Sequence, residues 1–329
     1  MQYPKHDHGP RLLSKGFYRK RILGVGIVEL MIAITIGMVL IAGAINVFVT
    51  SRKAYRASQQ VSRILENGLY ALEEIGRVVA IAGYYGQSSD PDQVRYLDPS
   101  DAANIRRIDM DQAPVLVGDC EARWYANLFR RVEGLNNSNA AYSTTCVPNT
   151  NYLPGTDILV ARYTDQATTP LTANTLYLRA DPLQQIMFVA PNAPDASNFS
   201  GIESDHAYHS VAFYVSPYYR SKNEVPLIPT LRRVEVAVGP TVAASNPDNP
   251  DLGEVVMEGV EDFQIQFGIS AGSDFVTKYV NPDAITGTNY ENIRSVRIWL
   301  LIRAESEDRD LKYTNQVRKD DLGKDREYV

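Results

Sequence analysis

The spacing of hydrophobic residues changes twice along the chain. Residues 30–49 form an unbroken apolar run, LMIAITIGMVLIAGAINVFV, that contains no charged side chain. At 1.5 Å per residue, about 20 helical residues span the roughly 30 Å hydrocarbon core of a bilayer. The run therefore predicts a membrane-spanning helix over about residues 30–50.

Beyond this run the apolar residues recur every three or four positions, which is the period of one helix face. They are Ala54, Ala57, Val61, Ile64, Leu65, Gly68, Leu72, Ile75, Val79 and Ala82. No proline occurs between Gly24 and Asp90, so we expect one nearly continuous helix that ends near Gly83, because glycine commonly follows a helix C-terminus. We expect the amphipathic half of this helix to pack on the domain that follows.

From residue 157 onward the pattern becomes a series of short β-type runs. We expect strands at residues 158–163, 175–179, 186–190, 210–215, 232–238, 255–267 and 294–303. In the last of these, alternate residues are apolar, which is the period of a strand with one buried face. The sequence therefore predicts an α+β fold in which the long N-terminal helix packs on an antiparallel β-sheet head domain.

The predicted head domain covers residues 84–329. Its first part, residues 87–156, is rich in Asp, Pro, Asn and Ser and predicts long loops around short strands at 114–118 and 123–129. From about residue 305 the chain becomes a tail dense in both charges, which we expect to be solvated.

Charge is distributed unevenly along the chain. The first 24 residues carry six basic side chains and one acid, so the remainder is more acidic than the net charge of −6 indicates. A basic cluster before a membrane segment predicts a cytoplasmic N-terminus, with the head domain on the other side. An acidic head domain argues against direct nucleic-acid binding, which needs a basic face.

Three kinds of N-terminal segment compete here: a secretory signal, a plain signal anchor and a prepilin leader. A secretory signal has a shorter apolar core, followed by small residues at its cleavage site. In this chain the small residue, Gly24, precedes the run, and a carboxylate, Glu29, lies at its start. A carboxylate inside a bilayer costs about 2.5–3.5 kcal/mol on insertion scales, so we expect Glu29 to have a partner.

The sequence Gly24-Val25-Gly26-Ile27-Val28-Glu29-Leu30-Met31 resembles the leader junction of type IV pilins. The resemblance implies that residues 1–24 are a leader, which a prepilin peptidase removes after Gly24 before it methylates Val25. Residues 25–83 would then form the mature helix. Glu29 becomes the fifth mature residue, and its carboxylate would neutralise the N-terminal amine of an adjacent subunit and so set the register of assembly. Val25 stands where that family usually has phenylalanine.

The chain after the membrane run is similar to the minor pilin family PilW. The similarity lies in Ser-Arg-Lys-Ala-Tyr-Arg at 51–56, Glu-Asn-Gly at 66–68 and Ala-Gly-Tyr-Tyr-Gly at 82–86. Residues 258–263 and 294–297 also resemble late segments of PilW and of the J-type pseudopilins of type II secretion. The similarity covers little of residues 87–250.

The resemblance implies a minor pilin that takes part in type IV pilus assembly and hence in twitching motility, within a tip or priming complex. Its expected partners are other minor pilins, the major pilin, the prepilin peptidase and the inner-membrane assembly platform, with a tip adhesin as a further candidate. The protein would lie in the inner membrane before assembly and in the pilus at the cell surface afterwards.

Two alternatives stay open at this point. A J-type pseudopilin of type II secretion would have the same leader and helix. A membrane-anchored adhesin or enzyme would keep its N-terminus, so Lys20 and Arg21 would still be present in the mature protein.

The sequence predicts no enzyme and no cofactor. It contains no Gly-x-Ser-x-Gly elbow, and Gly24-x-Gly26 opens no phosphate-binding loop. His206 and His209 have Glu203 and Asp205 nearby, but the spacing fits no zinc motif, and we expect these residues in a polar surface loop rather than a metal site. Twenty tyrosines could serve adhesion, although tyrosine is equally common in sheets and subunit interfaces.

The two cysteines, Cys120 and Cys146, both follow the membrane run. Outside the cytosol they would meet oxidising conditions, and a disulfide between them would stabilise the fold by about 3–4 kcal/mol in the chain-entropy model. The alternative is a pair of buried free thiols, because sequence does not show whether the two residues come within bridging distance.

Overall fold

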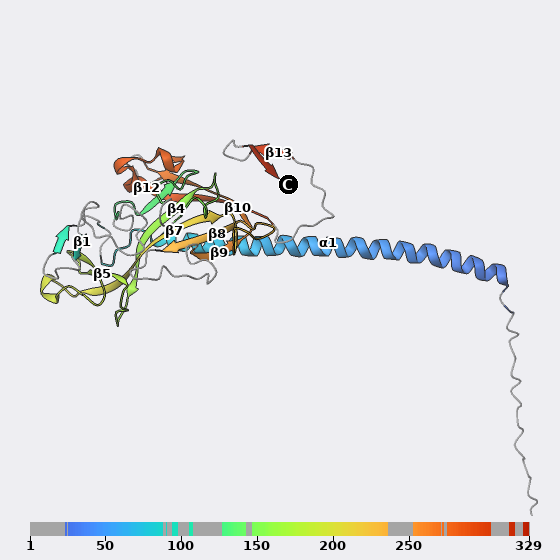
Figure 1. Ribbon diagram of the computed structural model, residues 1–329, viewed down its shortest axis with the longest axis horizontal. Helices are drawn as coiled ribbons and strands as arrows, with labels where there is room; N and C mark the ends of the chain where they lie inside the picture. The colour runs from blue at the N-terminus through green and yellow to red at the C-terminus, as the bar shows by residue number, and fades with distance from the viewer. Residues whose placement is uncertain are drawn as a thin grey trace, which may run out of the picture. The chain divides into compact units, whose positions relative to one another are not determined.

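A computed structural model describes the chain over residues 24, 26–87, 90, 94–97, 105–107, 127–142, 147–235, 253–270, 272, 275–303, 316–319 and 325–328. The chain divides into two compact units, residues 1–59 and 60–329. Helix α1 (Ile27–Ile81) begins in the first unit and ends in the second (Figure 1).

The C-terminus of α1 is a sharp turn into the head domain. Gly83 has a φ of +86°, a conformation that costs little only for glycine. The N–H of Gly83 donates to the carbonyl of Arg162 at 2.8 Å, and the N–H of Tyr84 donates back to the carbonyl of Ile81 at 3.0 Å. The turn therefore fixes the end of the helix directly to a strand.

The described strands form three sheets. Their bounds are β1 Val94–Leu97, β2 Ile105–Arg107, β3 Val132–Leu135, β4 Ile158–Ala167, β5 Leu176–Ala180, β6 Gln185–Val189, β7 Ser204–Ser216, β8 Thr230–Glu235, β9 Glu254–Glu258, β10 Val260–Ile269, β11 Lys278–Val280, β12 Ile293–Ile302, β13 Gln316–Lys319 and β14 Asp325–Tyr328. Short 3-10 helices lie at Ala196–Asn198, Pro282–Ala284 and Gly287–Asn292.

The largest sheet has nine strands and is organised around β7. Its main path runs β2-β1-β6-β5-β7-β4-β3, and β8 and β9 extend it from the second half of β7. Every pair is antiparallel except β1 with β6. The thirteen residues of β7 allow this branching, because its first half pairs with β5 and its second half with β8.

Two hydrophobic clusters cover opposite faces of this sheet. On β4, Leu159 and Ala161 belong to the cluster that also holds Ile75 and Val78 of α1, together with residues of β10 and β12 from the three-stranded sheet β11-β10-β12. Ile158 and Val160 belong to a second, tyrosine-rich cluster. The two-residue alternation along β4 thus places the helix and the smaller sheet on one face.

The expected α+β, pilin-like fold is confirmed: an apolar N-terminal helix is followed by a largely antiparallel sheet domain. The single strand expected at 255–267 was wrong, because β9 and β10 are separated at Gly259, which has a φ of +77°. Residues 127–129 lie outside any strand, and the strand expected at 114–118 lies outside the described residues.

The expected packing of the whole apolar stripe of α1 was also wrong in part. The buried residues of the helix are Gly68, Ala71, Ile75 and Val78. Val61, Leu65 and Leu72 are exposed instead, with 55%, 67% and 39% of their surface accessible. The stripe covers more of the helix circumference than the head domain does, so Gly68, Ala71, Ile75 and Val78 form the buried face and Val61, Leu65 and Leu72 lie on a neighbouring face.

Candidate assembly surface

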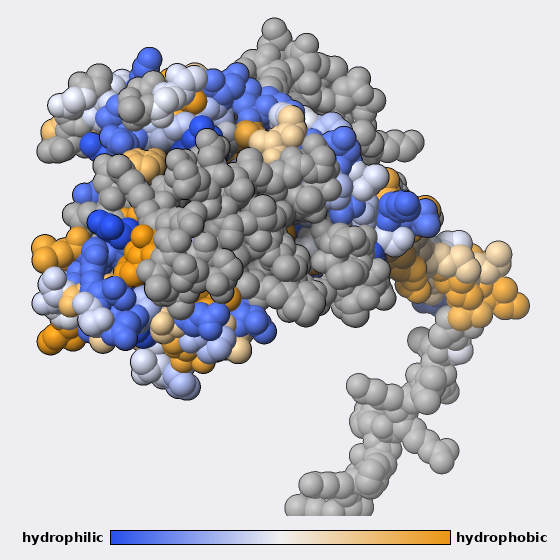
Figure 2. Space-filling model, turned by 60° about the vertical axis from the view of Figure 1, so that its left-hand side comes forward, coloured by the Kyte–Doolittle hydropathy of each residue, from blue (hydrophilic) through white to orange (hydrophobic). Residues whose placement is uncertain are grey.

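The first half of α1 carries a long apolar surface that nothing in its own unit covers. From Ile27 to Arg56 every residue is exposed except Gly37, which is half-buried. The helix is long and apolar enough to cross a membrane by length and composition. Figure 2 shows these apolar side chains in orange on the exposed helix. The length and composition of the helix therefore fit the membrane-spanning segment that the sequence predicts.

Glu29 lies in the first turn of α1 and is exposed. The carbonyl of Gly26 accepts from the N–H of Leu30 at 3.1 Å, so Glu29 is the third residue of the helix. A carboxylate there interacts favourably with the positive end of the helix dipole, an effect of about 0.3–1 kcal/mol. This is smaller than the cost of a carboxylate in hydrocarbon, so a helix-end role alone does not account for Glu29.

The predicted cleavage junction is described only in part. Gly24 has open space around its Cα, whereas Val25 lies outside the described residues. The cleavage and methylation expected at these two residues therefore stay predictions. Cys120 and Cys146 also lie outside the described residues, and the disulfide between them stays a prediction too.

The second half of α1 presents another apolar stripe, on a face next to that of the buried residues. Val61, Leu65, Leu69 and Leu72 follow each other at steps of four, four and three, and all are exposed. Residues at this spacing lie on one side of a helix. Leucines exposed in this way are suited to packing against another apolar helix.

A chain of ion pairs ties this half of α1 to the sheet. Glu74 pairs with Arg77 on the same helix at 2.7 Å and with Arg233 of β8 at 3.3 Å. Arg233 also pairs with Glu235 at 2.8 Å. The chain then continues to His209 of β7, whose two ring nitrogens contact Glu235 and Asp165, the latter at 2.9 Å.

The two carboxylates determine the charge of His209. Burial lowers the pKa of His209, but the hydrogen bonds and charges of Glu235 and Asp165 outweigh it and raise the pKa overall. Burial likewise raises the pKa of Glu235, and the contact with His209, helped by Arg233, lowers it overall. The imidazole is also stacked on the Tyr163 ring, with centroids 5.0 Å apart. The His209 imidazole, whose protonated form the two carboxylates favour, thus completes the link between α1 and the sheet.

The expectation that His206 and His209 lie in a surface loop was wrong. Both are on strand β7, and His206 is buried, with its ring nitrogens 2.8 Å from the Ser204 hydroxyl and 2.8 Å from the Asp165 carbonyl. The alternation of residues along β7 was the signal that could have placed both histidines on a strand. The polar residues around them obscured that alternation in the sequence. Over the described ranges, no group of three or more His, Cys, Asp or Glu residues could hold a metal ion.

A second polar group, which sequence reasoning missed, is centred on the buried side chains of Arg162 and Glu133 in the head domain. The Arg162 guanidinium of β4 is 3.0 Å from the Glu133 carboxylate of β3 and also donates to the carbonyl of Arg130. Glu133 pairs with Arg130 as well, and Arg130 stacks over the Tyr290 ring at 4.7 Å. Burial raises the pKa of Glu133, but the two arginines lower it overall. This group joins β3 and β4 to the segment before β12.

Residues 212–323 match the family described as type IV pilus-assembly protein W, PilW. The matched stretch starts within β7 and includes β8 to β13. It lies entirely in the head domain and so does not include α1 or the leader junction. No curated protein and no solved structure matches the chain.

Proposed function

We propose that this PilW-type pilus assembly protein is a minor pilin, which joins other minor pilins in a tip complex that primes the type IV pilus. The observation that carries the proposal is the pairing of a PilW-type head with an N-terminal helix whose first half exposes a long apolar surface. A head domain acting alone needs no such surface. A subunit that moves from a bilayer into a helical bundle does.

The leader junction has a defined role in this proposal. The prepilin peptidase cuts between Gly24 and Val25 on the cytoplasmic side, so the apolar helix remains part of the mature subunit. Methylation then follows on Val25. Glu29 pairs with the amine of Val25 in the next subunit, which removes most of the cost of a carboxylate in hydrocarbon.

The proposed role is one of assembly, so it assigns no catalytic residue. Before assembly the chain lies in the inner membrane with the leader in the cytoplasm. Its direct partners are other minor pilins, the major pilin and the assembly platform. Leu65 and Leu69 are the exposed side chains that we assign to helix contacts within the bundle.

Mass spectrometry of the membrane-extracted protein, with and without active prepilin peptidase, tests entry into the pilin pathway. The expected result is an N-terminus at Val25 only where the peptidase is active. An intact N-terminal region containing Lys20 and Arg21 in both strains would contradict the proposal and favour a plain membrane anchor.

A deletion strain separates the pilus from the type II secretion system. Loss of surface pili and of twitching motility, restored by the wild-type gene, is expected. A deletion strain with normal pili and defective protein secretion would reverse the assignment in favour of a J-type pseudopilin.

A further inference from the structure

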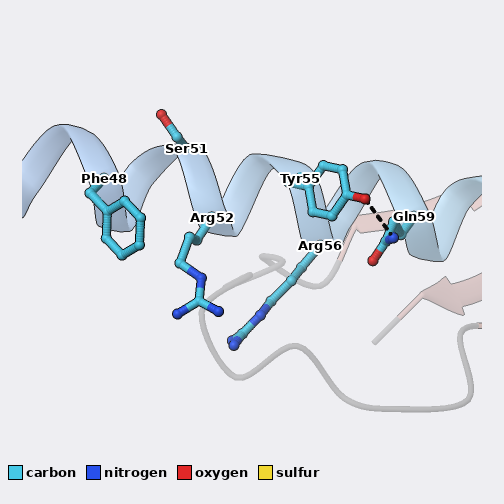
Figure 3. Close-up of a pocket in the computed structure, with 6 residues that line it drawn as sticks. All are labelled: Phe48, Ser51, Arg52, Tyr55, Arg56 and Gln59. Carbon is cyan, nitrogen blue, oxygen red and sulfur yellow. Dashed lines mark hydrogen bonds between the residues drawn. The ribbon is translucent and has the colours of Figure 1, made fainter.

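One side of α1 forms a small pocket just after the apolar run. It is lined by Phe48, Ser51, Arg52, Tyr55, Arg56 and Gln59 (Figure 3). These residues form two rows at four-residue spacing, 48-52-56 and 51-55-59, and such rows lie side by side on a helix. All six lie within the first compact unit. We call this surface the Arg52–Arg56 face.

The side chains of this face are ordered with respect to each other. The Arg52 guanidinium lies over the Phe48 ring, 5.4 Å from its centroid. The Gln59 amide donates to the Tyr55 hydroxyl at 3.0 Å. In Figure 3 the side chains of Arg52 and Arg56 extend to the same side of the helix. Two guanidinium groups therefore approach one region of solvent.

The positive charge of this face has no acidic neighbour in the sequence. Arg52, Lys53 and Arg56 follow one another within five residues, and no Asp or Glu occurs between Glu29 and Glu66. Both arginines are exposed. The region is therefore a site of concentrated positive charge, and its ligand should be an anion.

The position of the face along the helix indicates which anion. At 1.5 Å per residue, Arg52 lies about 4.5 Å and Arg56 about 10 Å beyond Val49, the last residue of the apolar run. The headgroup layer extends about 5–7 Å beyond the hydrocarbon on each side of a bilayer. Phe48 thus remains among the acyl chains and Arg52 lies within the headgroup layer. Tyr55 and Arg56 lie just beyond that layer, but the long Arg56 side chain extends back toward the Phe48 end of the helix in Figure 3, as a basic side chain does when it reaches toward a membrane surface.

We propose that the Arg52–Arg56 face binds the phosphate of an anionic phospholipid headgroup, in the leaflet at the C-terminal end of the apolar run. Guanidinium groups match phosphate oxygens in fork geometry, and a pair of them one helical turn apart can hold one headgroup. The bound lipid would fix the depth of the helix in the membrane. The proposal requires the membrane segment but not the pilus role.

The test uses the full chain reconstituted in phosphatidylcholine vesicles with trace amounts of spin-labelled lipid. Electron paramagnetic resonance then compares how strongly labelled phosphatidylglycerol and labelled phosphatidylcholine associate with the protein. The wild type should prefer phosphatidylglycerol. Arg52→Gln and Arg56→Gln should each reduce that preference about fivefold, the effect of one basic residue near a charged surface.

Two matched variants make the result specific. Arg63→Gln removes the same charge from an exposed position of the same helix, about 16 Å beyond Arg52, and should leave the preference unchanged. Arg52→Lys keeps the charge but lacks the fork geometry, so it should lose part of the preference for phosphatidylglycerol, and less of it than Arg52→Gln loses. An equal loss in Arg63→Gln, or no preference in the wild type, would overturn the proposal.

A final arm separates a lipid from free phosphate. Inorganic phosphate is added and compared with chloride at the same ionic strength. If the lipid is the ligand, its headgroup is held beside the face at a high local concentration, so millimolar inorganic phosphate should weaken the preference no more than chloride does by screening. Selective displacement by inorganic phosphate would assign the face to a soluble anion instead. Failure of the peptidase test would not affect any of these outcomes.

Discussion

At the scale of single residues, the buried pair of Arg162 and Glu133 should be critical for stability. Arg162 is fully buried, so removing the carboxylate leaves an uncompensated charge inside the head domain. Glu133→Gln should lower the free energy of unfolding by about 3–5 kcal/mol. Chemical denaturation of the full chain in detergent measures this change.

The matched control is an exposed ion pair in the same domain. Glu261 and Arg303 are 3.6 Å apart, and both are more than one-third exposed. Glu261→Gln should cost at most about 1 kcal/mol. Adding Arg162→Met to Glu133→Gln should recover part of the lost stability, since the unpaired charge is then gone. Equal destabilisation by Glu133→Gln and Glu261→Gln would contradict the critical role of the buried pair.

His209 should make the stability of the head domain depend on pH. Its pKa is raised above the ordinary 6.5, so its contribution is fully present below about pH 6.5 and is lost as pH rises through the folded value. The lowered pKa of Glu235 acts at the other end, because its contribution is present above about pH 4.5 and is lost as pH falls through the folded value. The contact between His209 and Glu235 should therefore stabilise the head domain most in mildly acidic solution.

The measurement is the melting temperature of the wild type and of His209→Gln across pH 5 to 9. The gap between them should narrow as pH rises above about 6.5. His206→Gln is the control, because that ring contacts a hydroxyl and a backbone carbonyl rather than carboxylates. Parallel curves for the wild type and His209→Gln would show that the folded protein does not raise the pKa of this imidazole.

At the scale of elements, the packing of α1 on β12 depends on one glycine. A Cβ atom at Gly68 would lie 2.7 Å from Cδ1 of Ile302, whereas a Cβ at Gly76 on the same helix meets nothing within 4 Å. Gly76→Ala should therefore stabilise by about 0.5–1 kcal/mol through helix propensity. Gly68→Leu should destabilise by about 1–3 kcal/mol through overpacking.

Chemical denaturation of Gly76→Ala and Gly68→Leu in detergent checks whether the free energy of unfolding changes in opposite directions. Gly68→Ala should gain less than Gly76→Ala, because Ile302 must move to admit the methyl group. If both alanine variants gained the same stability, the close approach of α1 and β12 at Gly68 would be wrong.

At the scale of the whole molecule, Glu29 should matter for assembly and not for folding. Glu29→Gln removes the charge that the proposal pairs with the Val25 amine of a neighbouring subunit, so the variant should be cleaved normally and yet fail to restore pili in the deletion strain. Glu66→Gln, an exposed acid on the same helix, is the control and should restore them. Immunoblotting for cleavage and electron microscopy for pili distinguish the two steps.

Two outcomes of the Glu29→Gln experiment would contradict the proposed role of Glu29 in assembly. Full piliation by Glu29→Gln would limit this residue to the helix-end role, where the dipole contributes less than about 1 kcal/mol. Loss of cleavage in the variant would instead place Glu29 in peptidase recognition. Neither result would change the stability of the head domain, since Glu29 belongs to the other compact unit.

The sequence by itself determined the features that depend on local order. The membrane segment follows from an uninterrupted apolar run, and the end of α1 follows from Gly83, whose positive φ suits only glycine. The α+β class follows from the change of hydrophobic period from helical to alternating. These signals lie in neighbouring residues, so they can be read without knowing what packs against them.

Only the tertiary structure decided which side chains meet. Leu65 and Gly68 belong to the same sequence stripe, yet one is exposed and the other touches β12, because a sheet covers only one narrow face of the helix. The partners of Arg162 and His209 come from strands far away in the sequence, so no local pattern identifies them. Burial and charge pairing are set by long-range contacts, which are present only once the chain has folded.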